Sequence, residues 1–360
     1  MTPNFSEILK RMEERMPWTI ARKVLEENKI DRSQGWERTK KRLAEDEAIS
    51  IEQIDTLVAN LIEHILCGEK ILRLYEVSEH ELEAFRNAAR ALSIPESPAK
   101  SRYPLSLTDE VLKLADLGHV LVAKHENADG LALVFSTVRV IVTRESLDAT
   151  TFPGETADIL AQYDEIVGLK NKRLQTMDVM WLPADGRYIE LRSDFPKQLN
   201  YREAEAGQAS MKFALGRLLG TDYLHTPVNL FPLIPAMYYD AAEGSVVELA
   251  FGTATASLKH EKMRRGSLSL RDEDYHKGGI AALELPISPF KISIEWTRDL
   301  GDGLSSNPEL SLHATTRDGA ADVGFLVDAV VRNCIGTDDF AHVRGRLQHH
   351  LENLEEGQPN

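Results

Sequence analysis

The sequence predicts an α+β protein, with an N-terminal all-helical domain followed by an α/β region that has mainly antiparallel sheets. Three observations indicate this fold class. Apolar residues recur at helical spacing before residue 92, as in the wide stripe from Ile54 to Ile65. The period changes to two after residue 117, as in half-buried strands. The length of 360 residues exceeds one small core and favours two or three domains.

The division into domains follows from the segment 93–104, which contains three prolines and is the best linker in the chain. We therefore expect a helical domain over 1–97, an α/β domain over 104–222, and a β-rich region with C-terminal helices over 223–360. Ser78 and Glu81 form a capping box at the start of the last N-terminal helix. The helices expected in the first domain lie near 4–15, 18–28, 36–46, 51–76 and 78–92.

Later elements are predicted from alternation and from turn signals. Asp185 and Gly186 form a turn before a strand over 187–192, and a helix over 203–219 ends at Gly220. A hairpin is expected around the turn 126–130. The other expected helices lie near 108–117, 155–168, 321–335 and 338–354. The other expected strands lie within 245–258, 279–287, 289–298 and 309–315. A long polar loop is expected over 259–279.

Composition and charge limit the class of protein. Hydrophobic residues make up 42% and charged residues 28%, as in a folded globular chain. No apolar run of about 18 residues and no signal-peptide pattern occurs, so we expect a cytoplasmic protein, nuclear if eukaryotic, with no membrane contact. Cys67 and Cys334 are predicted to be buried thiols. The net charge of −15 confines any nucleic-acid binding to a local basic patch.

Such a patch is predicted between residues 22 and 42, where eight Lys or Arg stand against four Asp or Glu on two short helices joined through Gly35. The same charges also fit two solvated helix faces with Trp18, Leu25 and Trp36 in the core, and this alternative stays open. The candidate contacts to nucleic acid are Arg22, Lys23, Arg38, Lys40, Lys41 and Arg42.

The sharpest enzymatic hypothesis is a Mg²⁺-dependent nuclease of the restriction-endonuclease type. Asp178 and Glu190 would hold the metal, because two converging carboxylates can polarise a phosphate and its attacking water. Arg192 stands where such enzymes have a lysine and cannot act as a base, so Lys197 would have to swing in. Gln208 follows on the next helix. The alternative is that Glu190 and Arg192 form a charged face on an exposed sheet.

Other catalytic signatures are missing from the sequence. It has no HExxH or CxxC spacing, no Walker A sequence, no GxGxxG after a strand and no GxSxG elbow. His349 and His350 are expected to be surface groups near a helix C-terminus. The sequence therefore predicts no cofactor outside the nuclease alternative.

Several segments occur in an order that resembles the family of centromere protein N, a subunit of the inner kinetochore. They are MPWTIARKVLEENKI, ERTKKRLAEDEAISIEQIDTLV, EKILRLYEV and YIELRSDF before a helix, within residues 1 to about 220. The resemblance implies a pyrin-like helical domain followed by an α/β domain, a non-catalytic role, and binding to nucleosomal DNA and to a related subunit. It implies the same basic residues, from Arg22 to Arg42, as DNA contacts.

The leading prediction is therefore a non-catalytic subunit of a protein complex that contacts DNA through its N-terminal helical domain, with other protein subunits as partners. The first alternative is the Mg²⁺-dependent nuclease centred on Asp178 and Glu190. The second is a purely protein-binding adaptor whose acidic surface meets a basic partner.

Overall fold

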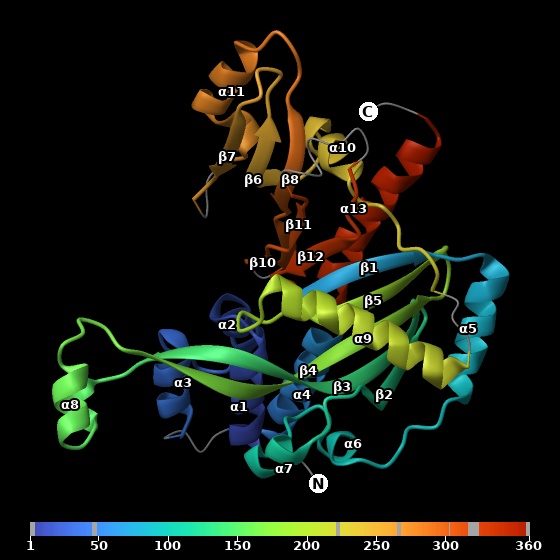
Figure 1. The fold of residues 1–360 in the computed structure, drawn as a ribbon. Helices are drawn as coiled ribbons and strands as arrows, with labels where there is room; N and C mark the ends of the chain where they lie inside the picture. Colours follow the sequence, from blue (N-terminus) through green and yellow to red (C-terminus); the bar gives the residue numbers. More distant parts are fainter. Residues whose placement is uncertain are drawn as a thin grey trace.

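A single antiparallel sheet forms the centre of the protein. The computed structural model describes residues 4–44, 49–220, 224–264, 268–301, 303–315 and 324–357. Within these residues ten strands pair in the order β2-β3-β4-β5-β1-β12-β11-β8-β6-β7 (Figure 1). The α+β class is therefore confirmed. The strands are β1 (Lys70–Glu76), β2 (Val120–Asn127), β3 (Gly130–Ser146), β4 (Val167–Pro183), β5 (Tyr188–Asp194), β6 (Ser245–Gly252), β7 (Leu258–Lys262), β8 (Ser288–Glu295), β11 (Glu309–His313) and β12 (Asp328–Arg332), with a separate pair β9 (Arg298–Gly301) and β10 (Leu304–Ser306).

Helices cover both faces of this sheet. The first face carries α5 (Glu79–Ala91) and α9 (Tyr201–Leu219), whose Phe85 and Met211 pack with Leu191 (Figure 1). The second face carries α1 (Phe5–Arg15), α2 (Trp18–Glu27), α4 (Ile51–Cys67) and α13 (Thr337–Glu355). The remaining helices are α3 (Gly35–Ala44), α6 (Pro98–Arg102), α7 (Asp109–Leu114), α8 (Glu155–Leu160), α10 (Leu233–Tyr239) and α11 (Asp274–Ala281).

The helix expected over 51–76 is confirmed as far as Cys67 and is wrong after it. Helix α4 ends at Cys67, and after Gly68 and Glu69 the chain forms β1. Alternation in KILRLYE places Leu72 and Leu74 on one face and Ile71 and Tyr75 on the other, so the segment fits a strand buried on both faces. Strand β1 lies between β5 and β12, in the middle of the sheet. The N-terminal helices are thus joined to the sheet by a central strand.

Three further expectations differ from the structure. The helix near 155–168 is shorter, because α8 ends at Leu160 and β4 begins at Val167. In the segment 321–335, residues 321–323 lie outside the described residues and 328–332 form β12, where the buried run DAVVR pairs with β1 and β11. The expected loop 259–279 and strand 279–287 contain instead β7 and α11, the latter capped by Glu273.

The central prediction of strand, turn and helix is confirmed by β5, by α9 and by Gly220, which has a φ of 73°. The exposed face expected on that strand is not found, because every residue of β5 is buried. Helix α13 and the N-terminal helices cover the face that carries Tyr188 and Glu190. Both predicted thiols, Cys67 and Cys334, are buried.

Strands β3 and β4 extend far beyond the rest of the sheet. They pair without interruption from Gly130↔Pro183 to Ser146↔Val167, whereas β2 pairs only with residues 130–136 and β5 only with residues 179–181. The distal half therefore projects as a two-stranded ribbon with α8 at its end (Figure 1). We call residues 140–173 the arm, with a shaft formed by 140–146 and 167–173 and a tip formed by 147–166.

Candidate functional site

A concentrated set of buried charges surrounds two aspartates on adjacent strands. Asp178 on β4 is fully buried and Asp194 at the end of β5 is 2% exposed. Asp178 Oδ1 accepts a hydrogen bond of 2.9 Å from the backbone N–H of Asp194. The carboxylate of Asp178 is therefore bonded to the backbone of Asp194, and the groups that neutralise each carboxylate determine what this site can do.

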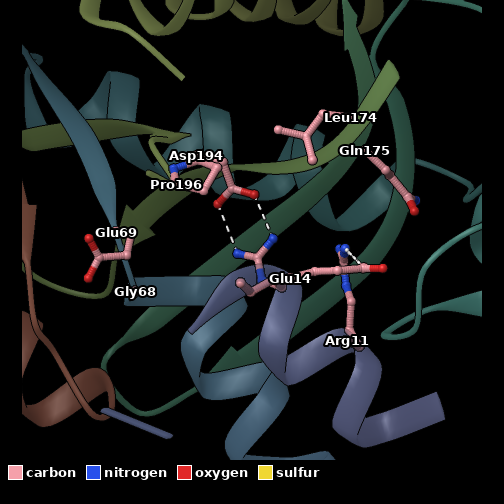
Figure 2. Close-up of a pocket in the computed structure, with 9 residues that line it drawn as sticks. Arg11, Glu14, Gly68, Glu69, Leu174, Gln175, Asp194 and Pro196 are labelled. Atoms are coloured by element: carbon pink, nitrogen blue, oxygen red, sulfur yellow. Dashed lines mark hydrogen bonds and ion pairs between the residues drawn. The ribbon is translucent and has the colours of Figure 1, made fainter. Parts of the chain in front are cut away.

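Asp194 connects the N-terminal helices to the sheet. Its two oxygens accept hydrogen bonds of 2.6 and 2.9 Å from the guanidinium of Arg15 on α1 (Figure 2). Lys70 Nζ on β1 lies 2.5 Å from Oδ1, and the backbone N–H of Met177 donates to Oδ2 at 2.6 Å. Burial opposes ionisation of this carboxyl, but Arg15 and Lys70 outweigh burial and hold its pKa well below the usual range. Asp194 is thus a carboxylate saturated by partners.

Asp178 is neutralised from the other side. Arg139 Nη2 on β3 donates to both oxygens at 2.8 and 2.7 Å, and Nη1 donates to the carbonyl of Asp194 at 2.8 Å. His119, just before β2, places Nε2 2.8 Å from Oδ2. Burial raises the pKa of Asp178, but Arg139 and His119 lower this pKa by more than burial raises it, so the net shift is downward. A metal ion here would have to displace the guanidinium of Arg139 from both carboxylate oxygens.

His119 also approaches a hydroxyl, which gives a Ser-His-Asp order. Ser210 Oγ on α9 lies 3.3 Å from Nδ1 of His119, whose other nitrogen faces Asp178. Two features oppose nucleophilic catalysis. Arg139 already neutralises the aspartate that would stabilise an imidazolium, and Ser210 lies in the middle of a helix, where backbone N–H groups are bonded internally and cannot form an oxyanion hole.

Glu190, the second predicted metal ligand, does not lie beside Asp178. Neighbouring residues on a strand point to opposite faces, and Trp181, which pairs with Glu190, is three residues after Asp178. The two carboxylates therefore point to opposite faces of the sheet. Glu190 Oε2 accepts a 2.8 Å hydrogen bond from Arg192, and Arg344 lies 3.5 Å from Oε1. This geometry does not bring together the metal ligands that the nuclease hypothesis requires.

Arg192 is held by packing as well as by charge. Its guanidinium carbon lies 4.1 Å from the ring centroid of Phe340 on α13 and 5.0 Å from that of Trp181, and it donates to the carbonyl of Leu66 at 3.1 Å. Gln208, on α9 across the sheet, donates to the carbonyls of Ile71 and Leu191. Both side chains join elements of the fold.

Lys197, the base proposed for the nuclease, lines an open cleft. It is exposed in the loop after β5, whereas Glu190 is fully buried. The cleft has a volume of about 910 Å³ and lies between the start of α2, this loop and the C-terminal strands. Trp18 and Phe195 line it together with charged groups of both signs, including Glu69 and Arg264. Because charges of both signs line the cleft, it does not favour the binding of a polyanion such as nucleic acid.

A second cavity, beside Asp194, is only of water size. Its volume is about 10 Å³, and Arg11, Glu14 and Glu69 are among the residues that line it (Figure 2). Arg11 is 2% exposed, donates to Ser106 at 3.0 Å and lies 3.3 Å from Glu14. This cavity cannot hold a substrate.

The predicted basic patch is divided between bound and exposed side chains. Lys40 pairs with Glu13 at 2.6 Å, and Arg42 pairs with Asp31 at 2.5 Å. Lys23 Nζ donates to the carbonyl of Ser305 at 2.5 Å and to Asn307 at 3.2 Å, and thereby ties α2 to the β10 region. The other three cations, which are exposed and have no ion pair within the part of the chain that the structure describes, are Arg22, Arg38 and Lys41.

One group of metal-ligand type converges within the described residues, formed by Asp240, Glu243 and His350. Arg346 donates to Glu243 at 2.8 to 3.1 Å, and Trp296 Nε1 donates to the same carboxylate at 2.8 Å. Burial raises the pKa of Glu243, but hydrogen bonds from His350 and Arg346 lower it further. The group is a buried ion pair. The expectation that His350 is a surface residue is wrong, because it is fully buried against Glu243.

The arm exposes apolar side chains to water, whereas the sites described above bury charged ones. Val142 is 60% exposed and Leu169 is 69% exposed, and Val140 and Val167 are also exposed. The register Val140↔Arg173, Val142↔Asn171, Arg144↔Leu169 and Ser146↔Val167 places all four apolar residues on one face. At its base the arm is held by Arg173, which donates to the carbonyls of Leu112 and Ala115 at the end of α7.

Comparison of the chain with protein-family profiles, with curated proteins and with solved structures found no match. Within the described ranges, no helix is both long enough and apolar enough to span a membrane.

Sequence reasoning identified Asp178 and Glu190 but missed Arg139, which neutralises Asp178, and the adjacent pairing of Asp194 with Arg15 and Lys70. These four missed residues come from four segments that only the strand order brings together. A signal was present in β1 and β5, because Lys70 and Asp194 are charged residues in otherwise strand-forming segments, and charged residues inside buried strands require opposite partners.

Proposed function

We propose that the protein is a non-catalytic subunit of a protein assembly and that the arm is its docking element. The observation that carries this proposal is the row of exposed apolar residues along one face of the arm, from Val140 to Leu169. Contiguous exposed apolar surface is typical of protein interaction sites. Beyond β2 and β5 the strands of the arm pair, among the described residues, only with each other, and such exposed strand edges are ready to pair with another chain.

The state of the buried carboxylates supports a role without catalysis. Asp178, Glu190 and Asp194 each face at least one arginine, and Asp178 and Glu190 point to opposite faces of the sheet. A nuclease needs carboxylates that converge on a metal and a phosphate. The buried charges instead join helices to strands, as structural ion pairs do.

Site-specific photocrosslinking in cells tests the docking role. A benzophenone amino acid is placed at Leu169 on the arm or at Phe213 on α9, since both side chains are 69% exposed. We expect Leu169 to give a discrete crosslinked species at irradiation and Phe213 to give none. Equal crosslinking from both positions, or none from the arm, would reject the docking role.

A second candidate function is contact with nucleic acid through the N-terminal helices. It is favoured by Arg22, Arg38 and Lys41, which are exposed on α2 and α3 and keep their charge available. Arg38 and Lys41 are three residues apart on α3 and share one face. This candidate is compatible with the assembly role, because different elements would make the two contacts.

The test is binding of labelled duplex DNA across salt concentrations. Reversing Arg38 and Lys41 to Glu should weaken binding and reduce the slope of log affinity against log salt by about 2, since each lost phosphate contact contributes about 0.9. A matched reversal at Arg202 and Lys259, which are exposed on other elements, should leave the slope nearly unchanged. Equal effects of both pairs would exclude this patch.

A further inference from the structure

The two parts of the arm carry opposite charges. The tip holds five carboxylates, all exposed, and no Lys or Arg: Asp148, Glu155, Asp158, Asp164 and Glu165. The shaft holds four basic residues and one acidic residue: Arg144, Lys170, Lys172 and Arg173 against Glu145. Lys170 lies 3.8 Å from Glu145, but both side chains are exposed, and such pairs contribute little. The arm is therefore a basic shaft with an acidic end.

This arrangement is self-complementary. If two arms lie antiparallel, the apolar faces with Val142 and Leu169 can pack together, and each acidic tip lies beside the basic shaft of the other. Arg144 shares the apolar face, whereas Lys170 and Lys172 lie on the opposite face of the same shaft. The shaft has seven residue pairs and spans roughly 23 Å at about 3.3 Å per residue, long enough to receive a tip. A two-fold pairing of this kind uses the same patch on both chains.

We propose that the arm docks on the arm of a second copy of this chain, in antiparallel orientation, and forms a homodimer. This inference rests on the proposed docking role of the arm and names its partner. Among the described residues nothing covers the exposed apolar face, and a second copy supplies both an apolar surface and groups of opposite charge.

The charge pattern favours a second copy over nucleic acid. A two-stranded basic ribbon can enter the major groove of DNA, and the shaft alone would fit that description. The tip argues against it, because five carboxylates at the end of the ribbon would meet the phosphate backbone. The whole chain also carries a net charge of −15. Only a partner that offers both a basic and an acidic surface satisfies both parts of the arm.

Charge reversal tests the pairing. The mass of the whole protein in solution is measured by sedimentation equilibrium at about 0.1 M salt, where we expect twice the chain mass of 40.3 kDa. Replacing Arg144 and Lys172 by Glu, or Asp164 and Glu165 by Lys, should each raise the dissociation constant at least about tenfold through like-charge repulsion. The control reverses Arg202 and Lys259, which lie outside the arm, and should leave the constant unchanged.

Combining the two arm variants in one chain restores opposite charges and should recover most of the lost affinity. A variant that simply misfolds the arm would not be rescued, so recovery separates pairing from damage. A monomer up to about 100 μM, dimerisation insensitive to both reversals, or no rescue by the combined variant would each overturn the proposal. So would DNA binding that is lost on reversal of Arg144 and Lys172 in a monomeric protein.

Disulfide trapping tests the orientation. One chain carries Asn171→Cys, on the same face as Val142 and Leu169, and a second carries Asp164→Cys, and the two are mixed under oxidising conditions. The antiparallel pairing predicts a bond between the two chains, whereas Cys67 and Cys334 are buried and inert. A crosslink from Leu169 to a different protein, with a monomeric purified chain, would end this proposal and leave the docking role standing. A dimer that gives no crosslink from the arm would reject both the arm-to-arm pairing and the docking role of the arm.

Discussion

Asp194 is the residue on which the junction between the N-terminal helices and the sheet depends. It faces Arg15 of α1 and Lys70 of β1 within a buried site, so its removal leaves two cations in a place that water cannot reach. We expect Asp194→Asn to lower the free energy of unfolding by about 3–5 kcal/mol. Urea denaturation measures this free energy. The control is Asp109→Asn: the exposed carboxylate of Asp109 lies 3.9 Å from Lys10, and its loss should cost less than about 0.5 kcal/mol. A similar small loss at Asp194 would contradict the structural role.

Glu69 makes stability depend on pH in the opposite direction from an ordinary paired carboxylate. Burial raises its pKa to about 7, although it accepts a 3.0 Å hydrogen bond from the backbone of Asn333. Its unfolded pKa is about 4.3. Between these values the folded state binds more protons than the unfolded state, so this residue lowers stability as pH rises, by at most about 1.4 kcal/mol per pH unit.

We expect Glu69→Gln to remove the loss of stability that Glu69 causes as the pH rises. The difference in unfolding free energy between the variant and the parent should therefore grow between about pH 4.5 and 7 and then level off. Urea denaturation across this range gives the curve. A difference that does not vary with pH would show that Glu69 is ionised throughout, as an exposed glutamate is.

The junction between α4 and β1 shows why a helix was expected where a strand is found. The apolar stripe continues past Cys67, and only Gly68 marks the change of period. A Cβ atom at Gly68 would lie 2.3 Å from the ring of His64, which is buried and cannot move aside. We expect Gly68→Ala to cost about 1–3 kcal/mol by overpacking.

Gly278→Ala on α11 is the matched control, because nothing lies within 4 Å of the added atom. It should be neutral or stabilise the protein by up to about 1 kcal/mol, since alanine favours a helix. Thermal or urea unfolding of both variants gives the comparison. If Gly68→Ala behaved like the control, the close packing at this junction would not determine where the strand begins.

For the whole molecule, local pattern predicted elements better than their arrangement. Alternation was enough to find β3, β5 and β8. A capping box helped to find α5, and helix-favouring residues ended by Gly220 were enough to find α9. The position of β1 between β5 and β12 depends on pairing with residues more than 100 positions away, which no local pattern contains. The candidate site follows the same rule. The sequence was enough to select Asp178 and Glu190 as carboxylates of metal-ligand type. It did not reveal the pairing register, which places the two carboxylates on opposite faces of the sheet.

The continuous sheet also bears on the three domains predicted from the sequence, which stay a prediction. Backbone hydrogen bonds run from β2 to β7, and β1, from the N-terminal segment, pairs with β12, from the C-terminal segment. Removing a side chain from either end should therefore affect the stability of the other. Leu57 on α4 and Leu312 on β11 are both fully buried, in different apolar clusters. Each change to Ala should cost about 2–5 kcal/mol.

Hydrogen exchange measured by mass spectrometry in increasing urea resolves the two ends of the sheet. We expect peptides from β2 and β3 and peptides from β8 and β11 to open at the same urea concentration, and Leu57→Ala and Leu312→Ala to shift both sets together. The reason is that loss of the central strands β1 and β12 leaves neither half with a complete sheet. If each substitution shifted only the peptides near it, the segments before 97 and after 223 would fold as separate units, as the linker prolines and the change in period predict.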